Sequence, residues 1–353
     1  MKGLYIGSTS AFAGKNITTL ALGLALQKQG LRVGYMKPVG RLPVVVDEST
    51  GDADAMLIRE VLGLDAAPDM LTPVIIPQNL RVSRLHEQGS RMTDVREAYE
   101  SLAHGRDIML VGGCGSFLHT GKHKGVDGLS IVRELSLATI LVDRFDTTLH
   151  YDAVLSIQQA LDKALLGVLF NDVPEDFMRD AEDILVPFLR ERSVEVLGLI
   201  PRDPLLNAIK ASELAWRLDG QIISGNAQSQ RIIEEFLIGT MQVENFMTYF
   251  RRQRNCATIA GGDRTDLQLV ALEGDCPCLI LTGNIPPNEL VRTRADQKGV
   301  PVIQVREDTY TVAKRMETIL GSQKLRELVK IERAAVLVAS VLDVQHVLEL
   351  LDR

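Results

Sequence analysis

The chain has 353 residues, of which 46% are hydrophobic, and a formal net charge of -7 at pH 7. This length and apolar content are sufficient for two buried cores, so we expect two domains. The negative charge argues against a dedicated surface for nucleic acids or anionic membranes, because those partners require clustered lysine and arginine. No apolar run approaches the roughly 18 residues of a membrane-spanning helix, and the N-terminus leads directly into an apolar strand, so we expect a soluble, cytoplasmic protein.

Between Lys2 and about Asp203, short apolar runs alternate with segments of helical length, the pattern of a parallel sheet with helices on both faces. The predicted strands are Leu4–Gly7, Arg32–Lys37, Val74–Ile76, Asp107–Gly112, Thr139–Asp143, Leu165–Phe170 and Val194–Ile200. The predicted helices are Gly14–Gln29, Ala53–Val61, Thr93–Ala103, Leu129–Leu137, Tyr151–Ala160 and Pro174–Arg192. Sheets of this kind bind their ligands at the carboxyl ends of the strands, so polar residues there are the candidate site residues.

The loop after the first strand is the principal candidate site. It reads Ser-Thr-Ser-Ala-Phe-Ala-Gly-Lys-Asn over residues 8–16 and runs into the first helix. The backbone N–H groups of such a loop and the positive end of the helix dipole bind phosphate, and Lys15 would reach the β and γ phosphates of a nucleotide. The match to Gly-x-x-x-x-Gly-Lys-Ser/Thr is partial, because Thr9 replaces the first glycine and Asn16 replaces the hydroxyl residue that binds magnesium. An ordinary strand-to-helix turn with an exposed Lys15 is the alternative.

Polar groups also follow other predicted strands. Lys37 could bring a second cation to a phosphate or a carboxylate, or face solvent. Asp52 and Asp54 open a helix, where they could hold Mg²⁺ or serve as N-terminal helix charges. Asn171 could read a purine edge or cap the next helix, and Gly113 permits close approach of the backbone to a ligand. The residues predicted to contact a nucleotide are Ser8, Thr9, Ser10, Ala11, Phe12, Ala13, Gly14, Lys15, Asn16, Ile17, Gly113 and Asn171.

A second α/β pattern follows a boundary that we place between Pro201 and Ile209. Its predicted strands are Gln221–Ser224, Ile232–Ile238, Ala257–Ala260, Cys278–Thr282 and Val300–Val305. Its predicted helices are Ala211–Leu218, Val243–Phe250, Pro287–Lys298 and Thr309–Gly321. Two C-terminal helices are predicted over Gln323–Glu332 and Ala334–Leu351, and the apolar face of the second needs a partner in this chain or in another subunit.

The candidate site of the second pattern is the run Gly261-Gly262-Asp263-Arg264-Thr265-Asp266. Flexible backbone, a fixed cation and helix-capping side chains at the end of a strand suit a small anionic ligand or a subunit contact. The alternative is a glycine turn in which Thr265 or Asp266 caps the next helix and Arg264 pairs with Asp263. The residues predicted for this site are Gly261, Gly262, Asp263, Arg264, Thr265, Asp266, Thr282 and Gly283.

These features together resemble a known pair of domains. Residues 1–205 resemble the dethiobiotin-synthetase-like, or cobyrinic acid a,c-diamide synthase-like, nucleotide-binding domain that also forms the N-terminal part of long phosphotransacetylases. Residues 208–321 resemble the DRTGG-type domain that follows it there, and 322–353 form a C-terminal helical segment. The matching stretches are residues 8–16, 37–40, 52–55, 110–115, 167–174, 198–204 and 261–266. The resemblance implies a P-loop NTPase-like parallel sheet followed by a smaller α/β domain, and no phosphotransacetylase catalytic domain is expected in this chain.

The resemblance also implies roles for individual residues. Lys15 would bind the nucleotide phosphates, Lys37 would lie near the transferred phosphoryl group or a substrate carboxylate, and Asn171 would lie near the base. The family pattern has threonine in place of Asn16 and an acidic residue in place of Gly112, so two of the three expected magnesium contacts are changed. The residues that would remain to hold Mg²⁺ are Asp54, Asn16 and Asp52.

We therefore expect a protein that binds ATP or another purine nucleotide and has a regulatory or sensory role in acetyl-phosphate and acetyl-CoA metabolism. Its second domain would sense a ligand or mediate formation of a homo-oligomer. An alternative hypothesis is an active ATP-dependent enzyme that activates a carboxylate, with Lys15 and Lys37 as its electrophilic residues. A third is a structural partner of a separate phosphotransacetylase. Asn16 and Gly112 favour binding over catalysis, because phosphoryl transfer depends on the metal for charge neutralisation.

Overall fold

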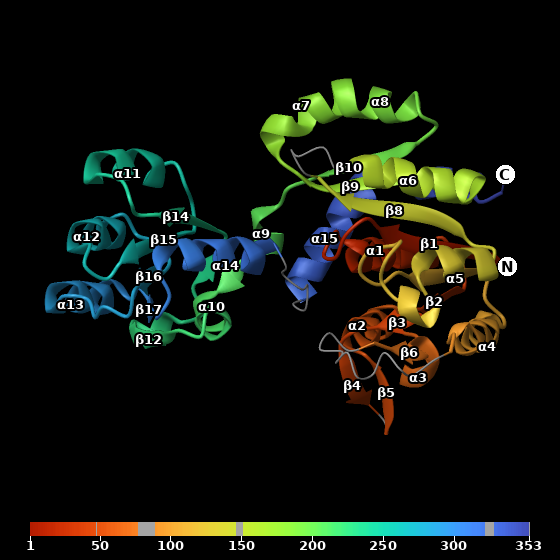
Figure 1. Ribbon diagram of the computed structural model, residues 1–353, viewed down its shortest axis with the longest axis horizontal. Coiled ribbons are helices and arrows are strands. Elements are labelled where there is room, and N and C mark those ends of the chain that lie inside the picture. Colours follow the sequence, from red (N-terminus) through yellow and green to blue (C-terminus); the bar gives the residue numbers. More distant parts are fainter. Residues whose placement is uncertain (47, 77–88, 146–150, 322–327, 353) are drawn as a thin grey trace. The chain divides into compact units, whose positions relative to one another are not determined.

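The computed structural model describes residues 1–46, 48–76, 89–145, 151–321 and 328–352. The chain divides into two compact units, one of Met1–Arg202 with Leu325–Arg353 and one of Asp203–Lys324 (Figure 1). The C-terminal segment therefore belongs to the first unit. Across the described ranges, no helix is both long enough and apolar enough to cross a membrane.

The first unit is built on a six-stranded sheet in which every strand pair is parallel, in the order β10-β9-β8-β1-β7-β2. Its strands are β1 (Lys2–Ser8), β2 (Val33–Met36), β7 (Ile108–Gly112), β8 (Ala138–Arg144), β9 (Leu165–Val173) and β10 (Val196–Pro201). The central strands are apolar almost without interruption, because a parallel sheet is covered on both faces. The predicted parallel sheet with helices on both faces is confirmed.

Two groups of helices cover this sheet. One face carries α1 (Lys15–Lys28), α2 (Ala53–Val61), α15 (Leu328–Val341) and α16 (Val344–Leu350). The other face carries α4 (Met92–Ala103), α5 (Gly128–Glu134), α6 (Tyr151–Leu161), α7 (Met178–Asp180) and α8 (Val186–Arg190). Each group of helices packs against one face of the sheet and forms a hydrophobic core with it. The carboxyl edge of the sheet therefore lies between two layers of helices.

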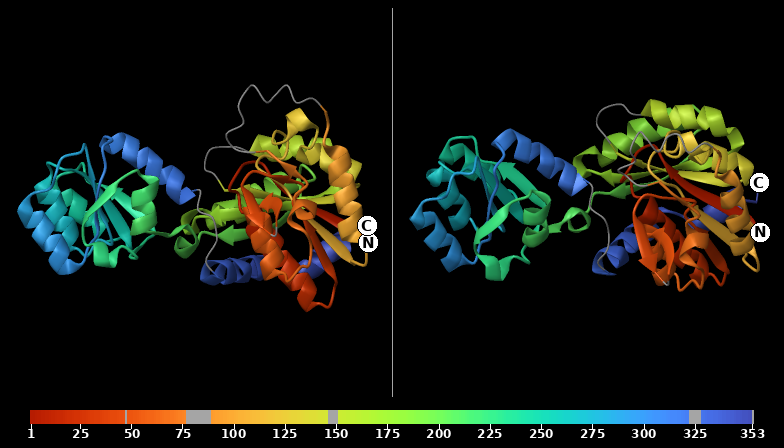
Figure 2. Two further views of the ribbon diagram at one scale, coloured as in Figure 1. Left: turned by 90° about the horizontal axis from the view of Figure 1, so that it is seen from below. Right: turned by 60° about the horizontal axis from the view of Figure 1, so that its bottom comes forward.

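The C-terminal helices contribute to the hydrophobic core that α1 and α2 form on one face of the sheet. Helix α15 packs against α1 and β10, and Figure 2 shows the C-terminal helices, in dark blue, along the first unit. Ile331 and Val338 are buried in this contact. The apolar face predicted for the C-terminus is therefore covered within the same chain. The first predicted C-terminal helix lies partly outside the described residues.

The region after β2 differs from the prediction. Val74–Ile76 was expected to join the main sheet, but β6 (Val74–Ile75) pairs only with β3 (Val39–Gly40). Strand β2 ends at Met36. The N–H of the next residue, Lys37, donates to the Leu71 carbonyl, 2.8 Å away, in the short helix α3 (Pro68–Leu71). A hairpin of β4 (Pro43–Val46) and β5 (Ser49–Asp52), which the sequence analysis did not predict, precedes α2.

The helix predicted over Pro174–Arg192 is interrupted. A 3-10 turn (Glu175–Phe177) leads into α7, a π-helical segment (Ala181–Leu185) and α8. Pro187 lies in the first turn of α8 and has no N–H to continue the α-helical hydrogen bonds, which accounts for the wider π turn before it. Other single 3-10 turns lie at Lys122–Lys124, Asp162–Ala164 and Asn226–Gln228.

The second unit has a five-stranded sheet in the order β12-β17-β16-β15-β14, parallel except for β12. Its strands are β12 (Gln221–Ser224), β14 (Glu235–Ile238), β15 (Cys256–Gly261), β16 (Leu279–Thr282) and β17 (Val302–Gln304). One face is covered by α11 (Val243–Phe250), α12 (Thr265–Glu273) and α13 (Glu289–Lys298), the other by α10 (Ala211–Arg217) and α14 (Thr309–Gly321). The predicted smaller α/β domain is confirmed.

One predicted strand of this unit is divided. Ile232–Ile238 was expected to be continuous, but β13 (Ile232–Ile233) pairs with β11 (Ile209–Lys210) and only β14 joins the main sheet. The break falls at Glu234, whose N–H donates to the Asn255 carbonyl at 2.9 Å. A single-turn helix, α9 (Pro204–Asn207), precedes β11.

Candidate functional site

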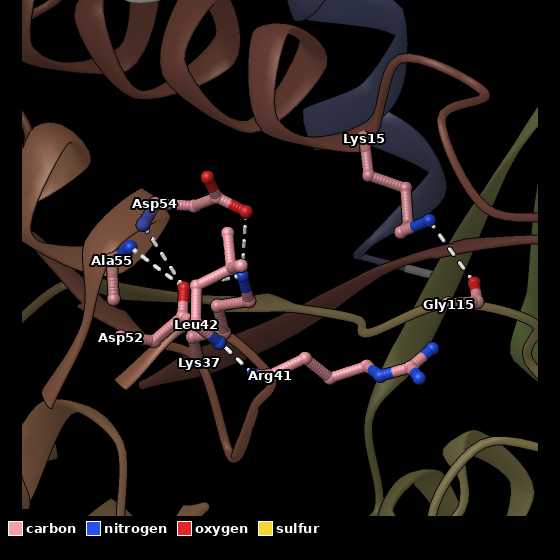
Figure 3. A network of polar contacts seen from close by, with 8 residues as sticks. All are labelled: Lys15, Lys37, Arg41, Leu42, Asp52, Asp54, Ala55 and Gly115. Atoms are coloured by element: carbon pink, nitrogen blue, oxygen red, sulfur yellow. Dashed lines mark hydrogen bonds and ion pairs between the residues drawn. The ribbon is translucent and has the colours of Figure 1, made fainter. Parts of the chain in front are cut away.

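Lys15 is the first residue of α1, and its side chain is enclosed by the loop that joins β1 to this helix. Its ammonium nitrogen Nζ lies 2.5 Å from the Ser8 hydroxyl and 3.3 Å from the Ser10 carbonyl. It also lies 3.0 Å from the Gly115 carbonyl beyond β7 (Figure 3). Only 7% of the residue is exposed, and burial lowers the pKa of this ammonium to about 8, with a further contribution from the neighbouring charge of Lys37. The predicted exposed-lysine alternative is therefore wrong. The loop encloses Lys15 in a ring of oxygen atoms, the type of ligand that phosphate also provides.

The backbone of the loop takes conformations that few residues adopt. Gly14 has φ +112°, and Phe12 has φ +59°, which is rare for a bulky side chain. Gly14 is the N-cap of α1 and has no side chain to satisfy the first N–H groups of the helix, and the first turn contains no acidic residue. These N–H groups and the helix dipole therefore favour an anion at this end of α1.

Neighbouring strand ends hold the loop in place. The Asn171 side-chain amide donates to the Ala13 carbonyl at 3.0 Å, from the carboxyl end of β9. The Thr9 hydroxyl bonds to the Asp143 carboxylate at the end of β8. Asn171 thus supports the loop backbone, a role that was not predicted, and its contact with a base stays a prediction.

Lys37 forms a buried ion-pair network after β2. Its Nζ lies 2.6 Å from Asp52 Oδ1 and 3.0 Å from Asp54 Oδ2, and its side chain is 5% exposed (Figure 3). Burial opposes the charged form of Lys37, but the carboxylates of Asp54 and Asp52 outweigh it and raise the pKa of the ammonium. Lys37 is therefore a fixed cation, and the solvent-facing alternative is wrong.

The carboxylate of Asp52 is committed to structure. It accepts the Arg41 and Leu42 N–H groups on Oδ2 at 2.8 and 2.9 Å, and those of Asp54 and Ala55 on Oδ1 at 3.0 and 3.4 Å. With Lys37 it has five donors, and the residue has no exposed surface. Asp52 caps α2 and closes the base of the β4–β5 hairpin.

The predicted magnesium ligands do not fit a divalent ion in this arrangement. Asp52 has no free coordination position, and one Asp54 oxygen accepts the Lys37 ammonium. Asn16 lies half-buried in the first turn of α1. Within the described ranges, no group of three or more His, Cys, Asp and Glu side chains could hold a metal ion. We therefore assign no step to Mg²⁺.

The remaining predicted contacts lie on the same loop or beside it. Gly113 donates its N–H to the Ile6 carbonyl at 2.9 Å, and a Cβ there would lie 2.8 Å from that oxygen. Its glycine is thus required by the close approach of β7 to β1. Ser10 and Ala11 are exposed and Ile17 is half-buried, so the loop tip is open to a ligand.

Three residues at this edge were not predicted. Asp172, which has φ +63°, accepts Arg144 Nη2 at 2.6 Å and Arg202 Nε at 3.0 Å. They come from the ends of β8, β9 and β10, which lie side by side. The polar residues at these strand ends were the only signal in the sequence, because their proximity depends on the strand order.

In the second unit, the predicted ligand residues come together but bond largely to one another. Arg264 places Nε and Nη2 each 3.0 Å from the two oxygens of Asp266, rather than pairing with Asp263, and also donates to the Met241 carbonyl. Helix α12 has no side-chain cap, so neither predicted cap is made. The Gly262 N–H donates to the Thr282 carbonyl at 3.3 Å, and the Gly283 N–H donates to the Glu307 carbonyl at 2.8 Å. These hydrogen bonds stabilise the turn between β15 and α12 and the one after β16.

Sequence comparisons decide the family. The profile of the AAA domain matches residues 2–210, more than half of the chain. The chain belongs to the AAA domain family. A second profile, that of the DRTGG domain, matches residues 213–319. The two domains of the predicted resemblance are thus confirmed, in the predicted order.

This AAA domain chain is similar to two kinds of curated protein. Phosphate acetyltransferase of Pseudomonas aeruginosa is 25% identical over 94% of this chain and 49% of its own length. ATP-dependent dethiobiotin synthetase of Methanococcus vannielii is 26% identical over 56% of this chain and 92% of its own length. The chain spans about half the length of the phosphate acetyltransferases that it matches.

Similar solved structures include cobyrinic acid a,c-diamide synthase of Mycobacterium smegmatis with bound ADP and magnesium. It is 17% identical, covers 57% of this chain and 87% of its own, and has a TM-score of 0.35. The CBS and DRTGG domains of a Clostridium perfringens pyrophosphatase, complexed with diadenosine tetraphosphate, are 14% identical over 46% of this chain and 83% of their own, with a TM-score of 0.28.

Proposed function

We propose that the first unit binds the phosphates of a purine nucleotide, ATP or a close analogue, at the loop around Lys15. The observation that carries the proposal is the Lys15 ammonium, buried within a ring of oxygen atoms from Ser8, Ser10 and Gly115. A phosphate that enters the loop can replace these oxygens on the ammonium and gain the unsatisfied N–H groups of α1. Membership of the AAA domain family supports this proposal.

We propose that nucleotide binding has a regulatory rather than a catalytic role. Phosphoryl transfer requires neutralisation of charge around the transferred group, usually by Mg²⁺. Here the candidate metal ligands are engaged with Lys37 and with backbone N–H groups. The site is thus equipped to hold phosphates and poorly equipped to turn them over.

The similarity to phosphate acetyltransferases supports a proposal for the regulated process. The alignment with the Pseudomonas aeruginosa enzyme covers almost the whole of this chain. We propose that the chain acts in acetyl-phosphate and acetyl-CoA metabolism, alone or beside a phosphate acetyltransferase. The second unit would be an assembly or sensing module, because its candidate residues brace a turn.

A series of titrations tests nucleotide binding. Calorimetry with ATP, ADP, GTP and adenosine, each in the presence and absence of Mg²⁺, should show binding of the phosphorylated compounds and little of adenosine. Equal binding of adenosine would place the recognition on the base and contradict the phosphate-loop assignment. The absence of any binding heat at millimolar nucleotide concentration would contradict the proposal.

The enzyme alternative is tested separately. An active carboxylate-activating enzyme would release ADP from ATP when a substrate carboxylate is added, and Lys15→Ala would abolish that release. The regulatory proposal predicts ATP binding without appreciable ADP formation. Steady ADP release that depends on a carboxylate and on Lys15 would establish the enzyme instead.

A further inference from the structure

Tyr35 and Gly112 face each other across two neighbouring strands. Tyr35 in β2 is in register with Leu110 in β7, so Gly112, two residues further on, lies on the same face of the sheet. A Cβ at Gly112 would lie 3.1 Å from the Tyr35 hydroxyl and 3.2 Å from its ring carbon Cε2. The phenol therefore occupies the space into which a side chain at position 112 would project.

The Tyr35 hydroxyl is buried without a hydrogen bond. The residue is 1% exposed, and the hydroxyl has no partner in the described parts of the chain. Burial, followed by the charges of Asp52, Asp54 and Cys114, raises the pKa of this phenol well above its usual value. A buried hydroxyl without a partner costs free energy.

Among the residues that the structure describes, the surroundings of this pair do not supply a set of ligands for a divalent ion. A cation between Asp52 and Asp54 would have to displace the Lys37 ammonium, which already lies within 3.0 Å of both carboxylates. A third ligand from the end of β7 is missing, because position 112 is glycine and the phenol ring lies against it. The fixed ammonium thus offsets part of the carboxylate charge that a metal ion would otherwise neutralise.

We infer that this site binds the di- or triphosphate of a nucleotide without a divalent metal, and that Tyr35 fills the space beside Gly112 in which a metal-binding side chain would lie. The inference rests on the proposed function and deepens it. Lys15 is the ammonium group available to the phosphates, because its partners are neutral oxygens whereas Lys37 is paired with the carboxylates of Asp52 and Asp54. A metal-free polyphosphate presents more negative charge to the Lys15 ammonium and to the N-terminus of α1 than its magnesium complex does.

Paired titrations test the inference. Wild-type protein should bind ADP with affinities that agree within about threefold in excess EDTA and in excess Mg²⁺. The double variant Tyr35→Ala, Gly112→Asp removes the phenol and adds a carboxylate, so Mg²⁺ should raise its affinity by about tenfold or more. Tyr35→Phe keeps the ring and should behave as the wild type.

The outcomes separate the two proposals. Loss of more than about tenfold in wild-type affinity in EDTA overturns the metal-free site while leaving nucleotide binding intact. Absence of binding in both buffers overturns the proposed function and this inference with it. If the double variant does not fold, the wild-type pair of titrations still decides the inference.

Discussion

The side-chain amide of Asn171 donates a hydrogen bond to the carbonyl oxygen of Ala13, 3.0 Å away and 158 residues earlier in the chain. This bond joins the end of β9 to the loop that encloses Lys15. The loop conformation therefore depends on a distant strand as well as on its own glycine.

Removal of this bond should loosen the loop. Asn171→Ala should lower the free energy of unfolding by about 1 kcal/mol and weaken ATP binding, because the Ala13 carbonyl loses its donor. Gln27→Ala is the matched control, since Gln27 Nε2 donates to the Leu62 carbonyl at 2.9 Å at the other end of α1. Urea denaturation and calorimetry measure both quantities. Equal losses of affinity in the two variants would contradict the support role.

Two constraints require glycine at position 14: its positive φ angle and the proximity of the Asn171 side chain. A Cβ at Gly14 would lie 2.5 Å from Asn171 Nδ2, and φ there is +112°. Gly14→Ala should cost about 1–3 kcal/mol in backbone strain, with a further loss from the clash. Gly30→Ala shares the positive φ, +86°, but meets no atom within 4 Å, so its smaller loss isolates the clash. Thermal unfolding of the two variants should differ; identical melting temperatures would exclude the predicted clash.

Binding should depend on pH through Lys15. The ammonium has a pKa of about 8 in the ligand-free protein, so it loses its charge above that pH, and ATP affinity should fall by up to about tenfold per pH unit. Lys15→Arg remains charged and should bind with a flat profile up to pH 9.5 or so. Calorimetry across this range checks the prediction, and a flat wild-type profile would contradict it.

The same pKa predicts that the stability of the fold rises with pH, whereas ATP affinity falls. Since the folded pKa of about 8 lies below the ordinary lysine pKa of 10.5, the unfolded chain binds more protons between these two values. The free energy of unfolding should therefore rise as the pH increases through this window, by up to about 3 kcal/mol. Lys15→Met should remove this increase. Urea titrations at several pH values measure it, and a wild-type contribution that falls through the window would be inconsistent with a buried ammonium.

The Lys37–Asp52 pair should matter far more than a surface pair. Lys37→Met leaves the buried Asp52 carboxylate without its cation and should cost about 3–5 kcal/mol. Lys2→Met breaks the partly exposed pair with Asp352 and should cost about 0–1 kcal/mol. Denaturant unfolding compares the two, and similar small costs would mean that solvent reaches the Lys37 pair.

The C-terminal helix α15 should stabilise the first unit. Val338 is 2% exposed and Val336, on the same helix, is 61% exposed. Val338→Ala should lower the free energy of unfolding by about 2 kcal/mol through lost burial, whereas Val336→Ala should have little effect. Urea denaturation measures both variants. Equal losses of stability in Val338→Ala and Val336→Ala would contradict the packing of α15 on α1.

The sequence could predict the features that depend on local spacing. Lys15 follows Gly14 at the start of a helix, and the alternation of apolar runs predicted the parallel sheet. Asp52 was left open between a metal ligand and a helix cap, because the choice depends on five donors that fold around it. The opposition of Tyr35 and Gly112 could not be predicted, because it requires that β2 and β7 be neighbours.

Calorimetric titration of ATP into wild-type, Lys15→Ala and Lys28→Ala protein tests the central claim most directly. Lys28 is exposed in the last turn of the same helix and serves as the control. We predict that wild type and Lys28→Ala bind alike and that Lys15→Ala loses at least about tenfold in affinity. Unchanged binding by Lys15→Ala would show that the loop around Lys15 is not the nucleotide site.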